Sequence, residues 1–153
     1  MRTALSYRGL PYRWGGASPR SGFDCSGFVQ AVYRKWGIYL PHCTSEQIHL
    51  GRRIPKSELQ AGDLVFFKNT YRHGVSHVGI YVGEGWFINA ASYGQGVTLS
   101  QLNSAYNEHH WLEARRIKLK PVPEDKEDVK PITVTVHEGG HDVKIVVGPT
   151  RHR

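Results

Sequence analysis

The sequence predicts an α+β fold, in which N-terminal helices pack on an antiparallel β-sheet. Apolar residues recur at helical spacing in the segment after Asp24: Phe28, Val29, Val32, Tyr33 and Trp36. Asp24 stands where a helix N-cap is expected, and Gly37 stands where that helix can end. From Gly62 onward the pattern changes to short apolar runs typical of strands, at residues 64–67, 77–82, 86–90 and 114–119.

Shorter segments complete the predicted fold. Residues 10–22 are rich in Gly, Pro and Ser and are expected to form a structured loop. Residues 44–50 can form a second, shorter helix capped by Thr44 or Ser45. The Gly-Glu-Gly stretch at 83–85 predicts a tight turn that joins two strands into a hairpin.

The chain is expected to divide into a main domain, residues 1–120, and a tail, residues 121–153. The tail starts with PVPEDKEDVKP, whose prolines and charges are typical of a linker. Residues 132–136 and 143–147 flank a glycine turn and predict a C-terminal β-hairpin. Because an isolated hairpin is marginal in water, this one is expected to pack on the main domain, on a partner or on a second copy.

Net charge, motifs and hydropathy limit the functions that this chain can have. The formal net charge of +7 predicts attraction to anionic polymers, such as nucleic acid, anionic lipid or the acidic polymers of a bacterial wall. RNA-binding motifs are absent, so nucleic-acid binding is not expected as the main role. No run approaches the roughly 20 apolar residues of a membrane span. Residues 1–10 lack the apolar region of a signal peptide, so either the chain is intracellular or a leader has been removed from it.

Cys25 is a candidate nucleophile at the start of the first predicted helix. A sulfur there meets unpaired backbone N–H groups and the positive end of the helix dipole, which favour the thiolate. The small residues Ser26 and Gly27 leave room for a substrate carbonyl and for amide donors to an oxyanion. The simpler interpretations are a buried, packing cysteine, or a disulfide with Cys43.

His77 and Asn89 are the candidate partners of Cys25. His77 opens a predicted strand on the face that also carries Gly79 and Tyr81. Asn89 lies inside the apolar run WFINA, where an amide needs a hydrogen-bonding partner. If the two strands pair, Asn89 can accept the ring N–H of His77 and orient the base. The alternatives are a surface histidine and an asparagine bonded to nearby backbone.

Four strings at these positions resemble the NlpC-type family of cell-wall cysteine peptidases, the gamma-D-glutamyl-diamino-acid endopeptidases. They are GLPYRWGG, GFDCSGFVQAVY, LQAGDLVFF and SHVGIYVGEGWFINAAS, in the family's order between about residues 10 and 116. The resemblance implies a papain-like fold and hydrolysis of peptidoglycan stem peptides, between gamma-D-glutamate and a diamino acid. It also implies a place in the cell envelope or outside the cell, and no metal or cofactor.

The resemblance assigns roles to individual residues. It places the nucleophile at Cys25, the base at His77 and the third polar group at Asn89, where the family usually carries histidine. Tyr12, and the small residue Ser26 after the nucleophile, fall at its oxyanion and substrate-binding region. Asp24 and Ser76 fall where the family's pocket engages the amino end of the stem peptide. The structural alternatives are a packing aromatic for Tyr12, a helix cap for Asp24 and a strand-end hydroxyl for Ser76.

Other interpretations stay open. The same triad can serve an amidase or a transpeptidase acting on another amide, and a wall-binding module without activity is a second class. His137 to His141 match the H-E-x-x-H zinc pattern, but two glycines and flanking β-branched residues predict a hairpin turn there. Cys43 is expected to be an incidental thiol near the cleft.

Overall fold

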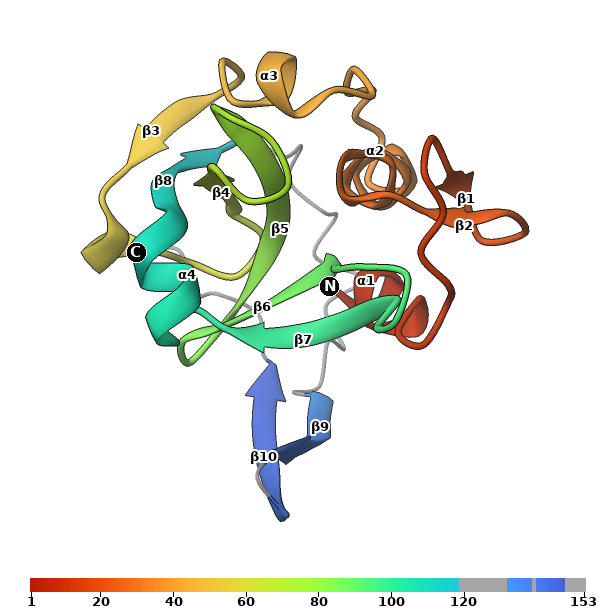
Figure 1. Cartoon of the computed structure of the whole chain (residues 1–153), viewed down its shortest axis with the longest axis vertical. Helices are drawn as coiled ribbons and strands as arrows, with labels where there is room; N and C mark the ends of the chain where they lie inside the picture. The colour runs from red at the N-terminus through yellow and green to blue at the C-terminus, as the bar shows by residue number, and fades with distance from the viewer. Residues whose placement is uncertain (119–131, 139, 148–153) are drawn as a thin grey trace, which may run out of the picture.

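The computed structural model describes residues 1–118, 132–138 and 140–147 (Figure 1). The helices are α1 (Arg2–Ser6), α2 (Cys25–Lys35), α3 (Thr44–Gln47), the 3-10 turn η1 (Lys56–Glu58) and α4 (Ala105–His110). The strands are β1 (Ala17–Ser18), β2 (Gly22–Phe23), β3 (Arg52–Ile54), β4 (Leu64–Lys68), β5 (Val75–Gly83), β6 (Trp86–Ala90), β7 (Val97–Gln101), β8 (Trp111–Arg116), β9 (Ile132–Glu138) and β10 (His141–Val147).

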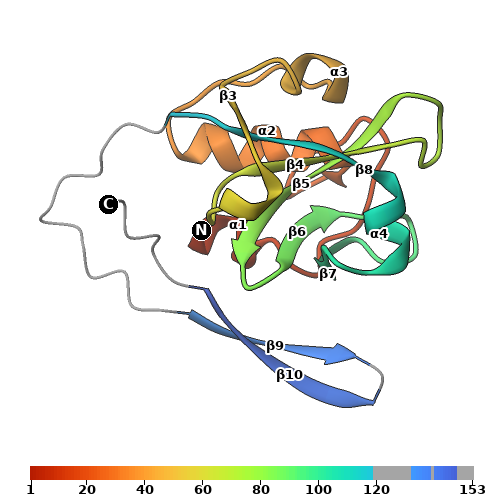
Figure 2. The same cartoon turned by 90° about the vertical axis from the view of Figure 1, so that its left-hand side faces the viewer.

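The described part of the main domain is built on a six-stranded antiparallel sheet in the order β3-β8-β4-β5-β6-β7. Helix α2 covers one face of this sheet and contacts β5 and β6 (Figure 2). Alternate residues of β5, Val78, Ile80 and Val82, join the core on that side, whereas Tyr81 belongs to a smaller cluster on the other side. The α+β fold predicted from the sequence is confirmed.

Helix α2 has the ends that its sequence predicts. The Asp24 carboxylate accepts the Gly27 N–H at 2.8 Å, and Gly37 adopts a φ of +85° directly after the C-cap residue Trp36. Arg34 and Lys35 lie in the last turn, where the helix dipole favours positive charge. The cap therefore fixes Cys25 as the first helical residue.

Strands β5 and β6 part before the end of the sheet. Their pairing runs from Gly83↔Trp86 to Ile80↔Ile88 and stops there. On the outer sides, β4 stays paired with β5 as far as Val75, and β7 stays paired with β6 as far as Ala90. The backbone of β5 from Val75 to Gly79 therefore has a strand partner on one side only.

The C-terminal hairpin is present and packs on the main domain. Val134 and Val136 of β9 pair with Ile145 and Val143 of β10, and their apolar side chains join the core cluster that contains α2. Arg8 donates to the Thr135 carbonyl at 2.9 Å, and β10 contacts β5. The segment predicted as a linker lies outside the described residues, so the division at residue 120 stays a prediction.

The H-E-x-x-H string lies across the turn of this hairpin. β9 ends at Glu138 and β10 begins at His141, with Gly140 at a φ of +81°. His137 pairs with Asp142 on the neighbouring strand, as expected for a turn. Within the described ranges, no group of three metal-ligating side chains occurs, and no helix is long and apolar enough to cross a membrane.

Burial of the hairpin predicts that it contributes to global stability. Ile145 is 1% exposed, so Ile145→Ala should lower the free energy of unfolding by roughly 2–5 kcal/mol. Val146 is 46% exposed and provides the matched control, since Val146→Ala should change it by less than about 0.5 kcal/mol. Urea denaturation measures both. An Ile145→Ala transition identical to wild type would show that the hairpin is not part of the folding unit.

Candidate active site

The Cys25 sulfur lies against the part of β5 that β6 leaves unpaired. The side chain is 4% exposed, its Sγ lies 3.9 Å from the Ser76 carbonyl oxygen, and it also hydrogen-bonds to the backbone of Val78. Ser76 and Val78 are the residues on either side of His77. The helix N-terminus thus brings the candidate nucleophile directly to the strand segment that carries the candidate base.

Asn89 holds His77 in one orientation. The Asn89 Nδ2 donates to the Thr98 carbonyl at 3.1 Å and to the Ser100 hydroxyl at 3.0 Å, so its Oδ1 faces His77. The Oδ1 accepts from His77 Nε2 at 2.7 Å. Because Nε2 carries the proton, Nδ1 is the nitrogen that can act as a base. The hydrogen bond expected between the two side chains is present, while their catalytic roles stay predictions.

Gly79 makes the approach of Asn89 to His77 possible. A Cβ atom at Gly79 would lie 2.7 Å from the Phe87 ring, 3.0 Å from the Ile88 carbonyl and 3.1 Å from the Asn89 Cβ. Any side chain there would push β6 and its amide away from the imidazole. Strand alternation places Gly79 on the His77 face, but sequence reasoning missed its role, although a glycine inside an apolar strand indicates close approach.

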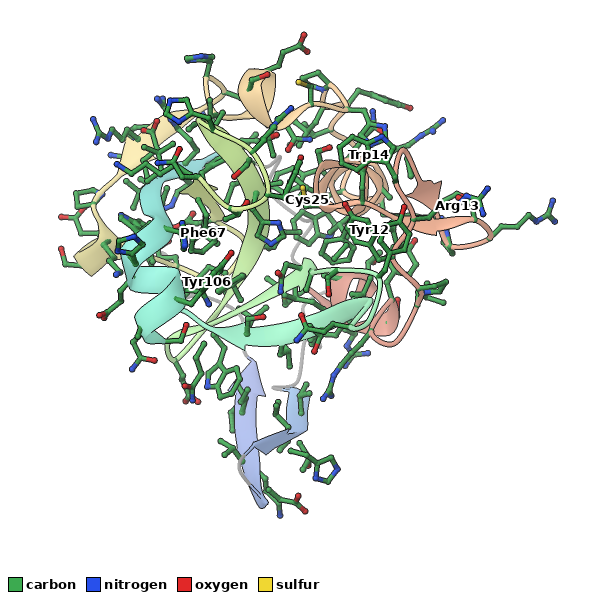
Figure 3. The ribbon with its side chains drawn as sticks, viewed as in Figure 1. Tyr12, Arg13, Trp14, Cys25, Phe67 and Tyr106 are labelled. Atoms are coloured by element: carbon green, nitrogen blue, oxygen red, sulfur yellow. The ribbon has the colours of Figure 1, made fainter. Side chains whose placement is uncertain are left out.

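The loop before α2 carries Tyr12 to the cleft. It is tied to the helix start by hydrogen bonds from Arg13 N–H to the Phe23 carbonyl and from Asp24 N–H to the Gly16 carbonyl. Tyr12 lies beside Cys25 (Figure 3). Burial, followed by the nearby Cys25 and Asp24, raises the Tyr12 pKa, so its hydroxyl stays protonated and can donate.

Asp24, Ser26 and Ser76 make their hydrogen bonds inside the protein. Asp24 accepts from the Gly15 and Gly27 N–H groups, from the Ser26 hydroxyl and from His42 Nε2 at 2.7 Å. Ser76 is fully buried, and its hydroxyl bonds to Thr70 in the loop between β4 and β5. In the free protein, Asp24 therefore acts as the helix cap. Contact of Asp24 or Ser76 with a stem peptide stays a prediction.

His42 is a member of the site that sequence reasoning missed. Its ring contacts Asp24 directly and lies close to Gly27, where a Cβ atom would be 2.9 Å from Nε2. No spacing pattern links His42 to Asp24, because an irregular segment after Leu40 brings it back over the helix start. Both cysteines are free thiols, so the disulfide alternative is wrong.

Comparison with known proteins identifies the family of this chain. The model of the NlpC/P60 family matches residues 9–116, which span the loop, the helix and the sheet described above. The chain belongs to the NlpC/P60 family. The resemblance found in the sequence is thereby confirmed.

Relatives of this NlpC/P60 chain are longer proteins. The bifunctional muramidase/DL-endopeptidase CwlT of Bacillus subtilis is 47% identical over 119 residues, covering 77% of this chain and 36% of the relative. The murein DD-endopeptidase MepH of Escherichia coli is 43% identical over 120 residues, covering 76% and 44%. A crystal structure of an NLP/P60-family protein from Staphylococcus aureus superimposes with a TM-score of 0.71 at 43% identity, covering 76% and 39%. The chain thus spans less than half of these proteins.

The NlpC/P60 site holds an uncharged thiol and an uncharged imidazole at neutral pH. Burial, reinforced by the Asp24 charge, raises the pKa of Cys25 to about 11. Backbone hydrogen bonds favour the thiolate and lower this pKa, but by less. Burial also lowers the pKa of His77, against its hydrogen bond with Asn89. The expectation that the helix start makes Cys25 a thiolate is wrong for the free protein, because desolvation outweighs the backbone groups.

The two thiols are predicted to differ in reactivity. The hydrogen bond with Ser45 lowers the pKa of Cys43, which is also more exposed than Cys25. Because the thiolate is the reactive form, iodoacetamide should modify Cys43 faster at pH 7, and labelling of Cys25 should keep rising up to pH 10. Peptide mass spectrometry of Cys25→Ser and Cys43→Ser variants separates the two rates. Rapid labelling of Cys25 that is constant above pH 7 would instead show a preformed thiolate–imidazolium pair.

Proposed function

We propose that this chain is a cysteine endopeptidase that hydrolyses amide bonds in peptidoglycan stem peptides. The observation that carries the proposal is the contact of the Cys25 sulfur with β5 on both sides of His77, whose Nε2–H is held by Asn89. This geometry supports Cys25 on α2 as the nucleophile, His77 on β5 as the base and Asn89 on β6 as the orienting group. CwlT and MepH are both named as endopeptidases, which supports the same chemistry here.

The proposed reaction is acyl transfer through the thiol. His77 Nδ1 takes the proton of Cys25 as the sulfur attacks the carbonyl carbon, since neither group is charged beforehand. The Tyr12 hydroxyl and backbone N–H groups at the start of α2 stabilise the oxyanion. His77 then protonates the leaving amine, and water releases the acyl group. Each step uses side chains or backbone of this chain.

The bond we propose is the one between gamma-D-glutamate and the diamino acid of the stem peptide. The sequence motifs support this bond, and so does the DL-endopeptidase activity for which CwlT is named. MepH is named a DD-endopeptidase, so cleavage between D-configured residues is the second candidate. Both bonds lie in the cell wall, and the charge of +7 would favour residence among its anionic polymers. We therefore propose the cell envelope or the exterior as the site of action.

Digestion of purified muropeptides tests the proposal. Wild type and Cys43→Ser should release fragments cut after gamma-D-glutamate, whereas Cys25→Ser should lose the activity by at least about 1,000-fold, because the hydroxyl is a far weaker nucleophile without further activation. Fragments are identified by mass spectrometry, and thermal unfolding checks that the variants fold. Equal digestion by Cys25→Ser would overturn the thiol mechanism. Digestion of another amide alone would favour the amidase or transpeptidase, and wall binding without cleavage by wild type would favour a binding module.

The pH dependence of the reaction tests the role of Asn89. As the pH is lowered, protonation of His77 should reduce kcat/KM. Since burial lowers the His77 pKa, the midpoint of this acidic fall should lie below about pH 6.5, the ordinary value for histidine. Asn89→Asp places a carboxylate on the imidazole and should move that fall to higher pH. Asn89→Ala removes the orienting group and should lower kcat by roughly 10- to 100-fold. Asn103→Asp adds the same charge at an exposed position outside the site and should leave the profile unchanged. An unmoved profile in Asn89→Asp would argue against His77 as the base.

A further inference from the structure

A cavity of about 500 Å³ adjoins the candidate base on the side away from the nucleophile. Its size lies in the range of small-molecule binding sites. Loops, strands and α4 contribute its lining: Thr70, Tyr71, His77, Asn89, Ala91, Ser92, Gln95, Ser100, Tyr106 and Asn107. His77 and Asn89 thus connect this space to the proposed chemistry.

The cavity and the sulfur lie on different sides of β5. Neither Cys25 nor Tyr12 belongs to the lining, and Figure 3 shows Cys25 and Tyr106 on opposite sides of the strand. The acyl part of a substrate must lie at the sulfur and its oxyanion donors. The leaving amine must instead lie beside His77, which gives it a proton. The residue that carries this amine therefore extends toward the cavity.

The lining is polar but carries no fixed charge. Its hydroxyls and amides come from Thr70, Ser92, Gln95 and Asn107, and His77 is neutral at pH 7 because burial lowers its pKa. Two charged residues follow lining residues directly in the chain: Glu108, which is exposed, and Arg72. The Arg72 guanidinium donates to the Thr44 hydroxyl and the Val75 carbonyl, and neither charged residue belongs to the lining. A cation entering this space would lose part of its hydration without meeting a carboxylate in the lining.

We infer that this cavity receives the leaving diamino acid and selects against a side chain that ends in a lone ammonium. Side chains with no net charge at the end are favoured, whether the distal amine is acylated or balanced by a carboxylate on the same carbon. The hydroxyls and amides satisfy such groups as donors and acceptors, and the Tyr71 and Tyr106 rings cover the methylene chain. This inference rests on the proposed function, and it adds a determinant of which stem peptides are cleaved.

Three peptides that differ only in the leaving residue test the inference. Each has the form L-Ala-gamma-D-Glu-X-D-Ala, with X as L-lysine, Nε-acetyl-L-lysine or meso-diaminopimelate. The acetylated and diaminopimelate peptides should have kcat/KM values about tenfold or more above that of the lysine peptide. Equal values would overturn the inference and leave the proposed function intact. No cleavage of any peptide, with intact muropeptides also uncut, would overturn the proposed function itself.

A charge placed in the lining provides the matched test. Gln95 is exposed, lines the cavity and uses its Oε1 as an acceptor for Ser92, a role that glutamate can keep. Gln95→Glu should raise the ratio of kcat/KM for the lysine peptide over the acetyl-lysine peptide by at least about fivefold. Asn103→Asp adds a carboxylate outside the cavity and should leave this ratio unchanged. An unchanged ratio in Gln95→Glu, or the same rise in Asn103→Asp, would contradict the assignment.

Discussion

The site depends on the separation of β5 from β6 beyond the Ile80↔Ile88 pair. If the two strands stayed paired to their ends, the backbone of Ser76 and Val78 would be closed to other partners. Because they part, the start of α2 can reach this segment and place the Cys25 sulfur against the residues on both sides of His77. The outer strands β4 and β7 hold the two parted strands, so the opening is fixed by the sheet and does not rely on a mobile loop.

The neutral triad follows from the same geometry. Burial of the sulfur beside Asp24 disfavours the thiolate, and burial of His77 disfavours the imidazolium. An asparagine at position 89 orients the ring without supplying negative charge, so its hydrogen bond offsets only part of the cost of an imidazolium before substrate binds. Charge then forms only as the sulfur attacks, when the Tyr12 hydroxyl and the helix N–H groups face the developing oxyanion. The donors are thus arranged for the transition state more than for the resting enzyme.

Local patterns in the sequence predicted the parts of the fold that local physics determines. The cap at Asp24, the end of α2 at Gly37 and the turn at residues 83–85 all come from short-range hydrogen bonds and backbone preferences. The second helix is shorter than expected and ends at Gln47. β7 was missed although Val97 and Leu99 alternate with polar residues, because two apolar positions make only a weak strand pattern. The strand order that places β8 between β3 and β4 could not be predicted, since it depends on pairing between distant segments.

The same distinction applies to the site. The Asn89–His77 bond could be predicted because adjacent strands in a hairpin bring positions of one face together. The His42–Asp24 contact could not, because it depends on where an irregular segment folds back. Nor could the thiol pKa, because the sequence shows the helix start but not the depth of burial. Desolvation is a property of the assembled core, and here it reverses the sign of the shift that the helix end alone would give.

The hairpin tail is connected to the site through β5. The strand that carries His77 at one end also contacts β10, and the hairpin lies beyond the β5–β6 turn in both orthogonal views (Figures 1 and 2). Val134, Val136 and Ile145 belong to the same core cluster as Cys25, Phe28 and Val78. The hairpin therefore packs into the same core as the strand that carries His77, and none of its described residues lines the cavity beside His77.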